Sequence, residues 1–387
     1  MTKQRVNHLS AEKEFLFSAV RWAVSGGFQP VASDNIDWAI VADEAVYHGV
    51  LPQLHRCLED TGLFDILPHE VSNTIRMSFE HNRKRNLGLA GDLWLVLKRL
   101  EAEGITAISF KGPSLAMLAY GNLAWREFVD VDILVAERDL AKVATVLQSA
   151  GYEPHRDPSV LSDPVFVSIE REFYFTSSRR GTMIDIQWRL SSSVLPFDVD
   201  IEDMLSNRIL VHPGGKEIPT ARLEDSLLLI CVHGSRHHWS SLKWLTDVAG
   251  LINLNPQIDW ELVLRQARAL NCQRVLSHSL LLACDLMGAQ LPPTLDNFAR
   301  RDRASREIAG SICETLAQPL LVPMTKFDVH RYFWKLQNGP VDRFRHFFRV
   351  VFTPNVADWE FRRLPTSLKF LYWFMRPLRL IGQPWSC

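Results

Sequence analysis

The alternation of hydrophobic and polar residues places helical stretches on either side of a short β-rich region. From residue 10 to residue 100, apolar residues recur every three or four positions, as in helices with one buried face. Ser10 precedes the first of these helices, where its hydroxyl can cap the N-terminus. At Gly104 the pattern changes to short apolar runs that predict strands, at 105–110, 129–135, 172–176 and 183–188. Helical spacing at 139–150 predicts that helices alternate with these strands.

This pattern divides the chain into four regions. We expect a helical lead-in (1–100), a compact α/β core (101–215), a helical domain (216–330) and a distinct C-terminal segment (331–387). The core is expected to end at the turn Pro213-Gly214-Gly215, because helical periodicity resumes at Leu223. The predicted fold class is therefore α+β, a small mixed sheet with helices, flanked by mainly helical regions.

Composition narrows the class of protein. The chain has 387 residues, 47% of them hydrophobic, which is enough for a large buried core. Its formal net charge of -1 argues against nucleic acid as a partner, since backbone binding relies on a basic surface. Six scattered cysteines without a Cys-x-x-Cys pair indicate neither zinc nor disulfides and suit a reducing cytoplasm. We expect no secretory signal and no membrane-spanning helix.

Three aspartates lie within apolar runs, where carboxylates are unusual. Asp130 and Asp132 alternate with valine and isoleucine, so on a strand both carboxylates point to one face. Such like charges repel unless a cation offsets them, and Mg²⁺ or Mn²⁺ takes oxygen ligands that it shares with substrate phosphates. With Asp185, which has the same apolar setting, they predict a divalent-metal site. The alternative for Asp185 is an ordinary strand carboxylate paired with Arg189 or Arg126.

A glycine turn precedes these acids. Lys111-Gly112-Pro113-Ser114 follows a predicted strand and opens a predicted helix that runs to Tyr120. Pro113 suits the first helical position, and the free amides of a helix N-terminus attract phosphate. Gly112 would let a phosphate approach the backbone, and Ser114 would add a hydroxyl donor. Lys111 would either neutralise a triphosphate or be only a solvated turn lysine.

Together these motifs resemble the uncharacterised nucleotidyltransferase family within the DNA polymerase beta-like nucleotidyltransferase superfamily. The resemblance is densest from 105 to 135 and rests on Phe110-Lys111-Gly112, Tyr120-Gly121, Arg126, Asp130-Val131-Asp132 and Leu134-Val135. Downstream, Asp185-Ile186-Gln187-Trp188 is similar to a family segment that more often has His in place of Gln187. The family's later helical segment and its usual ending resemble His233-Gly234, His237, Trp239, Leu242, Trp244, Asp247 and Arg376-Pro377-Leu378-Arg379-Leu380.

The resemblance implies a reaction type. It implies metal-dependent transfer of a nucleoside monophosphate from an NTP to an acceptor hydroxyl or phosphate, with release of pyrophosphate. Relatives suggest a small molecule, a sugar or a modified peptide as acceptor. In the implied mechanism Asp130 and Asp132 hold the metals and Asp185 helps to activate the attacking hydroxyl. The alternative is a non-catalytic nucleotide-binding or regulatory protein with the same fold, and a nucleic-acid end-modifying enzyme is a weaker third hypothesis because of the near-neutral charge.

Further candidates for the nucleotide site flank the acids in the sequence. Arg126, four residues before the first acid, is interpreted either as a salt bridge that positions the strand or as a bidentate phosphate contact. His233 and His237 share a helical face but lack the glutamate of a His-Glu-x-x-His motif, so packing behind the site is preferred to zinc ligation. With Trp244, which could stack on a base, and Asp247, they are expected to border the nucleotide.

The C-terminal segment differs in composition from the rest of the chain. Residues 331–387 contain ten Lys or Arg and three acids, a net of +7, together with many aromatic residues. Prolines at 354, 365 and 377 argue against one long amphipathic helix. Three interpretations remain: docking on the protein's own core, which we prefer, contact with an anionic membrane surface, and binding of a partner.

Overall fold

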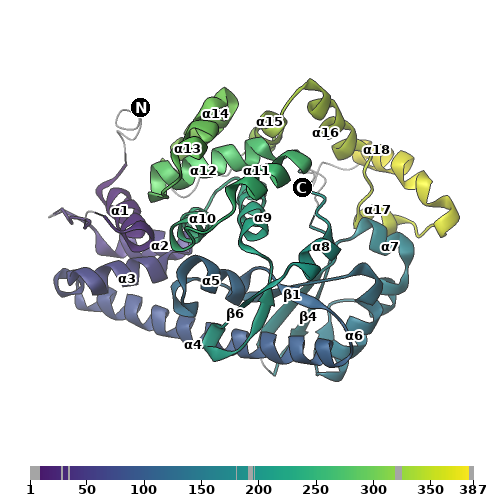
Figure 1. Cartoon of the computed structure of the whole chain (residues 1–387), viewed down its shortest axis with the longest axis horizontal. Coiled ribbons are helices and arrows are strands. Elements are labelled where there is room, and N and C mark those ends of the chain that lie inside the picture. The colour runs from purple at the N-terminus through teal and green to yellow at the C-terminus, as the bar shows by residue number, and fades with distance from the viewer. Residues whose placement is uncertain are drawn as a thin grey trace.

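The computed structural model describes residues 9–27, 29–33, 35–179, 181–190, 195, 197–318 and 325–382. A mixed sheet lies between a long helix on one side and a group of helices on the other (Figure 1). The fold is α+β, as predicted.

Four α-helices lie in the described part of the N-terminal region: α1 (Ala11–Ser25), α2 (Trp38–Tyr47), α3 (Leu51–Thr61) and α4 (His69–Ala102). Ser10 caps α1 as predicted, since its Oγ accepts a hydrogen bond from the backbone amide of Lys13 at 3.4 Å. The long helix α4 runs along the lower edge of the molecule in Figure 1, beneath the sheet. Its buried Asn82 and Asn86 donate side-chain hydrogen bonds to the carbonyl of Arg126, which fixes the chain just before the central strand.

The sheet of the described residues has seven strands in the order β3-β4-β5-β2-β1-β7-β6. Their bounds are β1 (Ala107–Ser109), β2 (Asp130–Val135), β3 (Glu153–Pro154), β4 (Glu172–Ser177), β5 (Thr182–Gln187), β6 (Ile209–Val211) and β7 (Ile218–Thr220). The four predicted runs all contain strands, but Val129 precedes β2 and is 63% exposed rather than packed. The other three strands have two or three residues each, too few to show a period in sequence.

The sheet continues past the expected end of the core. Pro213–Gly215 forms the turn between antiparallel β6 and β7, and its two glycines have φ of 58° and 77°. Ser109 of β1 pairs in parallel with Thr220 of β7, so residues beyond 215 complete the sheet. Pro213-Gly214-Gly215 is a turn, as the sequence indicated. The same residue types form hairpin turns and links between domains, so composition alone could not show that the sheet continues.

Helices α5 (Gly112–Tyr120), α6 (Leu140–Ser149), α7 (Pro164–Ile169) and α8 (Ile201–Ser206) accompany the strands. The helical region that follows contains α9 (Leu223–Arg236), α10 (Leu242–Leu254), α11 (Trp260–Ala269), α12 (Gln273–Met287), α13 (Pro293–Arg301) and α14 (Arg303–Ala317). Helix α10 packs closely on α5, and a Cβ at Gly250 would lie only 2.5 Å from the carbonyl oxygen of Ala119. Glycine at this position therefore lets the helical region approach the sheet region.

A buried hydrogen-bond network stabilises the helical region. His278 is fully buried on α12, where its Nδ1 contacts the carbonyl of Arg274 at 2.7 Å and its Nε2 accepts from Trp239 Nε1 at 3.0 Å. Burial is the main reason that the pKa of His278 is lowered to about 4. The imidazole is therefore neutral at pH 7 and serves packing.

Four α-helices lie in the described C-terminal part of the chain: α15 (Lys326–Leu336), α16 (Pro340–Phe352), α17 (Val356–Phe361) and α18 (Tyr372–Gly382). A 3-10 helix, Thr366–Leu371, connects the last two. Trp359 of α17 is buried, packs edge-on against Phe166 of α7 and donates a hydrogen bond to Asp163 at 3.2 Å. Helices α16 and α18 lie at the right-hand edge of Figure 1 and pack on each other. In the part of the chain that the structure describes, no helix has the length and apolar character needed to cross a membrane.

Candidate active site

The register of the central strands brings the three aspartates to one face of the sheet. Strands β2 and β5 are parallel, and Asp132 stands directly opposite Asp185. Residues paired in this way project to the same side of a sheet, and Asp130 lies two residues before Asp132 on that side. The third acid is thus a neighbour of the other two despite its distance in sequence.

Two side chains, Lys111 and Gln187, hold the carboxylates of Asp132 and Asp185. Lys111 Nζ donates to Asp132 Oδ1 at 2.9 Å. Gln187 Nε2 donates to Asp132 Oδ1 at 3.1 Å and to Asp185 Oδ2 at 2.6 Å, and so bridges the two strands. The partner of Asp185 is therefore Gln187, two residues along its own strand, and neither Arg189 nor Arg126 pairs with it.

The carboxylates are crowded and partly removed from water. Asp132 is only 4% exposed, whereas Asp130 and Asp185 are half-buried. Burial, followed by the charges of Asp132 and Glu172, raises the pKa of Asp185 to about 7. Burial and then the charge of Asp132 also raise the pKa of Asp130. Such crowding favours a bound cation or proton.

The carboxylate oxygens of the site are ligands of the kind that a hard divalent cation prefers. Asp185 Oδ1 is buried and has no hydrogen-bond partner among the described residues, so one carboxylate oxygen is available as a ligand. Yet no group of three or more His, Cys, Asp or Glu side chains among those residues is arranged to hold a metal ion. The donor types at Asp130, Asp132 and Asp185 therefore fit such an ion, while their present positions do not form a finished ligand set.

The glycine turn lies against the central strand. Gly112 has φ of +51°, and a Cβ there would stand 3.2 Å from the carbonyl oxygen of Asp130. Both its conformation and this contact favour glycine. Lys111 precedes α5, while Ser114 is fully buried and its Oγ has no hydrogen-bond partner among the described residues. Lys111 thus reaches the acids, whereas the Ser114 hydroxyl lies in the interior.

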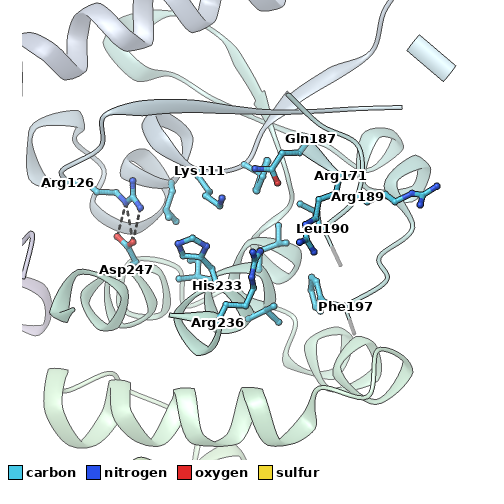
Figure 2. Close-up of a pocket in the computed structure, with 15 residues that line it drawn as sticks. Lys111, Arg126, Arg171, Gln187, Arg189, Leu190, Phe197, His233, Arg236 and Asp247 are labelled. Atoms are coloured by element: carbon cyan, nitrogen blue, oxygen red, sulfur yellow. Dashed lines mark hydrogen bonds and ion pairs between the residues drawn. The ribbon is translucent and has the colours of Figure 1, made fainter. Parts of the chain in front are cut away.

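A pocket opens beside the carboxylates, between the sheet and helix α9 (Figure 2). Lys111 and Gln187 line it and also contact the acids, so they join the two parts of the site. Of the described side chains that line it, five are cationic and one is acidic. The lining comprises Phe110, Lys111, Leu115, Arg126, Arg171, Gln187, Arg189, Leu190, Phe197, Leu229, Ile230, Val232, His233, Arg236 and Asp247.

The one acid in the pocket lining is already paired. Arg126 forms a two-pronged ion pair with Asp247 of α10, with Nε–Oδ1 and Nη2–Oδ2 distances of 3.0 Å (Figure 2). Tyr120 donates its hydroxyl to the same carboxylate at 2.9 Å. Of the two sequence interpretations of Arg126, the structure shows a salt bridge, but its partner is on a helix of the next region. Asp247, which is 1% exposed, anchors Arg126 in the wall of the pocket.

The predicted histidines and tryptophan lie in two places: His233 lines the pocket, whereas His237 and Trp244 form a separate ring stack. His233 lines the pocket, and burial together with the charge of Lys111 lowers its pKa well below the ordinary value. It is neutral at pH 7. His237 stacks on Trp244 with ring centroids 4.9 Å apart, and neither lines the pocket. His237 covers one face of the Trp244 ring.

Sequence analysis missed two arginines that line the pocket. Arg236 follows His233 by three residues on α9, so helical spacing from a predicted site residue would have found it. It is half-buried, and the structure gives it no hydrogen bond or ion pair with another described residue. Burial and the nearby charge of Arg171 lower its pKa. Arg171 directly precedes β4, and no motif marked it. Two cations held close together favour a bound anion.

Comparison with known proteins fits this geometry. A family model described as "Uncharacterised nucleotidyltransferase" matches residues 34–288. The chain belongs to this family. The match extends from the N-terminal helices through the sheet to the end of α12, so it includes the acids, the glycine turn and every residue of the pocket lining. A search of curated proteins finds no match.

Proposed function

We propose that this family member is a metal-dependent nucleotidyltransferase that moves a nucleoside monophosphate from an NTP to an acceptor hydroxyl or phosphate. The observation that carries the proposal is the pairing of Asp132 with Asp185 on adjacent parallel strands, with Asp130 on the same face. A cationic pocket adjoins these acids. Carboxylates beside a polyanion site are the parts that phosphoryl transfer requires.

In this proposal Asp130, Asp132 and Asp185 hold Mg²⁺ or Mn²⁺. When bound, such an ion neutralises phosphate charge and stabilises the charge that develops during transfer. Asp185 Oδ1, which has no hydrogen-bond partner in the described part of the chain, and the raised pKa values of Asp130 and Asp185 support this assignment. Lys111 offsets part of the negative charge on Asp132 and faces the pocket, so it is placed to contact the phosphates as well.

The triphosphate would lie in the cationic pocket. Arg126 is neutralised by Asp247, so the cations that remain to hold phosphate are mainly Lys111 and Arg236, with Arg171 nearby. Guanidinium groups bind phosphate oxygens in a bidentate manner, which also orients the chain of phosphates. Ser114, His237 and Trp244 have no direct part in this arrangement.

The transfer itself is an in-line displacement. The acceptor oxygen forms a bond to the α-phosphorus while the bond from that phosphorus to the α–β bridging oxygen breaks, and pyrophosphate leaves with the bonding electron pair. Asp185 takes the proton of an acceptor hydroxyl, since its Oδ1 accepts no hydrogen bond from another described residue.

One observation favours a second candidate function, nucleotide binding without turnover. The amine of Lys111 and the amide of Gln187 already contact Asp132, so part of its charge is satisfied by the protein itself. Gln187 also stands where the family resemblance leads one to expect histidine. A protein of this kind would bind an NTP but release it unchanged.

Labelled nucleotides distinguish the two functions. The purified chain is incubated with each NTP, carrying label on the α- or γ-phosphate, with Mg²⁺ or Mn²⁺ and a panel of sugars, small hydroxylated molecules and peptides. Transfer of the α-label with release of labelled pyrophosphate supports the enzyme. Calorimetric binding of an NTP without transfer to any acceptor supports the second candidate, and absence of both refutes both.

Matched variants test the acids. Asp130→Asn and Asp132→Asn are expected to lower transfer at least about 100-fold while NTP binding changes far less, because the lost groups act mainly in the transition state. Asp43→Asn removes an exposed carboxylate elsewhere and is the control. Transfer that survives both substitutions at the control rate would overturn the assignment of the acids.

A further inference from the structure

Exposed aromatic side chains are concentrated at one end of the chain. Among the described residues, eight of the ten exposed aromatic side chains lie in the C-terminal helices α15 to α18 and their connections. They are Trp334, Phe344, Phe347, Phe348, Phe361, Phe370, Trp373 and Phe374. Exposed apolar side chains that gather on one part of a soluble protein often mark an interaction surface. We call these residues, with the exposed aliphatic residues of α16 and α18, the C-terminal apolar patch.

Helix α18 presents a continuous apolar face. Phe374, Leu378 and Ile381 are 63%, 70% and 85% exposed. Their spacing of four and then three residues places them on one side of the helix. The opposite side is held by Tyr372, which is fully buried and donates its hydroxyl to the carbonyl of Arg362 at 2.8 Å. The apolar face is therefore fixed outward by the packing of the rest of the helix.

Helix α16 packs on α18 and adds a second apolar row. Val341, Phe344 and Phe348 are exposed, and the Phe344 and Phe348 rings lie 4.6 Å apart. Phe348 also stacks on Phe352 at 5.3 Å. The two helices lie together at the edge of the molecule in Figure 1, away from the α/β sheet.

The acids of this segment are all engaged, so its cations dominate the surface. Asp342 pairs with Arg345, Asp358 is buried between Arg376 and Arg379, and Glu360 pairs with a core arginine. Cations of the segment that form no ion pair with another described residue are Arg331, Lys335, Arg343, Arg349, Arg362, Arg363 and Lys369.

We propose that the C-terminal apolar patch docks this protein on the surface of a membrane rich in anionic lipids. Exposed aromatic and aliphatic side chains would enter the boundary between headgroups and acyl chains, while the arginines and lysines contact lipid phosphates. Trp359 meanwhile attaches α17 to α7 of the core, so the α/β region is held close to that surface. Like charge opposes pairing of two copies through this patch, and Leu378 and Ile381 have no ring to stack on nucleic-acid bases.

Vesicle binding tests this proposal with the full chain. Sedimentation is measured with vesicles of phosphatidylcholine alone and of phosphatidylcholine with about 30% phosphatidylserine, at low and high salt. We expect binding to the anionic vesicles that weakens at high salt, because the headgroup attraction is screened. The variant Phe374→Ser/Leu378→Ser/Ile381→Ser is expected to bind at least about tenfold more weakly, since it lacks three apolar groups that would enter the membrane.

A charge variant separates the two contributions. In Arg362→Glu/Arg363→Glu/Lys369→Glu, vesicle affinity is expected to fall roughly fivefold for each cation that is lost. The loss should be larger still, because each new glutamate is repelled by the anionic lipids. The control Lys84→Glu/Arg268→Glu/Arg306→Glu changes three exposed cations elsewhere by the same total charge.

An apolar control completes the set. Val31→Ser/Val46→Ser/Met77→Ser removes three exposed apolar side chains outside the patch and should bind as the unaltered chain does. Four results would overturn the proposal: no binding to anionic vesicles at low salt, equal binding to neutral vesicles, controls as weak as the test variants, or a concentration-dependent dimer that the apolar test variant abolishes.

Discussion

The ion pair between Arg126 and Asp247 allows a quantitative test of how the sheet and helical regions are joined. The Arg126 side chain is 12% exposed and that of Asp247 is 1% exposed. Replacing Arg126 with Met keeps most of the volume but leaves a buried carboxylate whose remaining side-chain donor is Tyr120. Removal of one partner from a buried pair typically costs about 3–5 kcal/mol. Because the tyrosine hydroxyl remains, we expect Arg126→Met to lower the free energy of unfolding by about 3 kcal/mol.

A double variant isolates the pair itself. Arg126→Met/Asp247→Leu removes both charges, and Tyr120 keeps a hydrogen bond to Thr246 Oγ1 at 3.0 Å. Buried pairs replaced by apolar residues of similar size are often neutral in stability, so the double variant is expected within about 1 kcal/mol of the unaltered protein. The coupling energy between the two substitutions should therefore exceed about 2 kcal/mol.

Urea unfolding followed by tryptophan fluorescence and far-ultraviolet circular dichroism gives these values, provided that both probes report one transition. The control is Arg303→Met, which removes an ion pair to Glu307 whose arginine is 85% exposed. That change should cost less than about 1 kcal/mol. If Arg126→Met costs no more than Arg303→Met, the reasoning about burial is refuted. A double variant as unstable as the sum of its single variants would refute the coupling.

Three further predictions rest on single positions. Burial lowers the pKa of His278 to about 4, so between about pH 6.5 and pH 4 the unfolded chain binds a proton at this residue that the folded protein does not bind. The free energy of unfolding should therefore fall by about 3 kcal/mol as the pH decreases over this range. In acid unfolding curves, His278→Gln should lack that part of the pH dependence. Gly250→Ala should destabilise the protein by about 2 kcal/mol or more, because the added Cβ would lie 2.5 Å from the Ala119 carbonyl oxygen. Its control, Gly88→Ala, places a Cβ in open space on α4 and should stabilise the protein by up to about 1 kcal/mol. Thermal unfolding measures both changes. Arg236→Met should weaken NTP binding in calorimetry about tenfold or more while leaving the melting temperature nearly unchanged, because the charge has no protein partner among the described residues.

Each of these predictions has a result that contradicts it. Parallel acid slopes for the unaltered chain and His278→Gln would show that this imidazole does not control acid stability. Equal effects of alanine at Gly250 and Gly88 would mean that the close helix approach is not required. Unchanged NTP affinity in Arg236→Met would remove this residue from the nucleotide site.

The sequence correctly predicted those features that depend only on residues a few positions apart in the chain. The alternation around Asp130 and Asp132 fixed their common face, because side chains on a strand alternate whatever the strand packs against. Ser10 as a cap follows from the same kind of short-range chemistry. The glycine turn at Gly112 was also found in sequence, although its reason is a contact with the Asp130 carbonyl that only the fold creates.

Long-range pairing decided what the sequence left open. The meeting of Asp185 with Asp132 follows from the register of β2 and β5, and the partner of Arg126 follows from the packing of α10 on the sheet region. The inward direction of Ser114 and the stacking of His237 on Trp244 likewise depend on neighbours far apart in sequence or across a helix. Arg171 enters the pocket because β4 pairs with β5, and a lone arginine carries no periodic signal.

The sequence by itself determined the helix and strand types, the shared face of two acids and the chemistry that carboxylates beside a glycine turn can perform. Its short-range rules depend on spacing of a few residues, where backbone geometry permits few alternatives. The tertiary structure alone decided which distant side chains meet, which hydroxyl is buried and which cation lacks a partner among the described residues. Those outcomes depend on strand register and helix packing, where many arrangements satisfy the same local pattern and close packing of the whole core selects one.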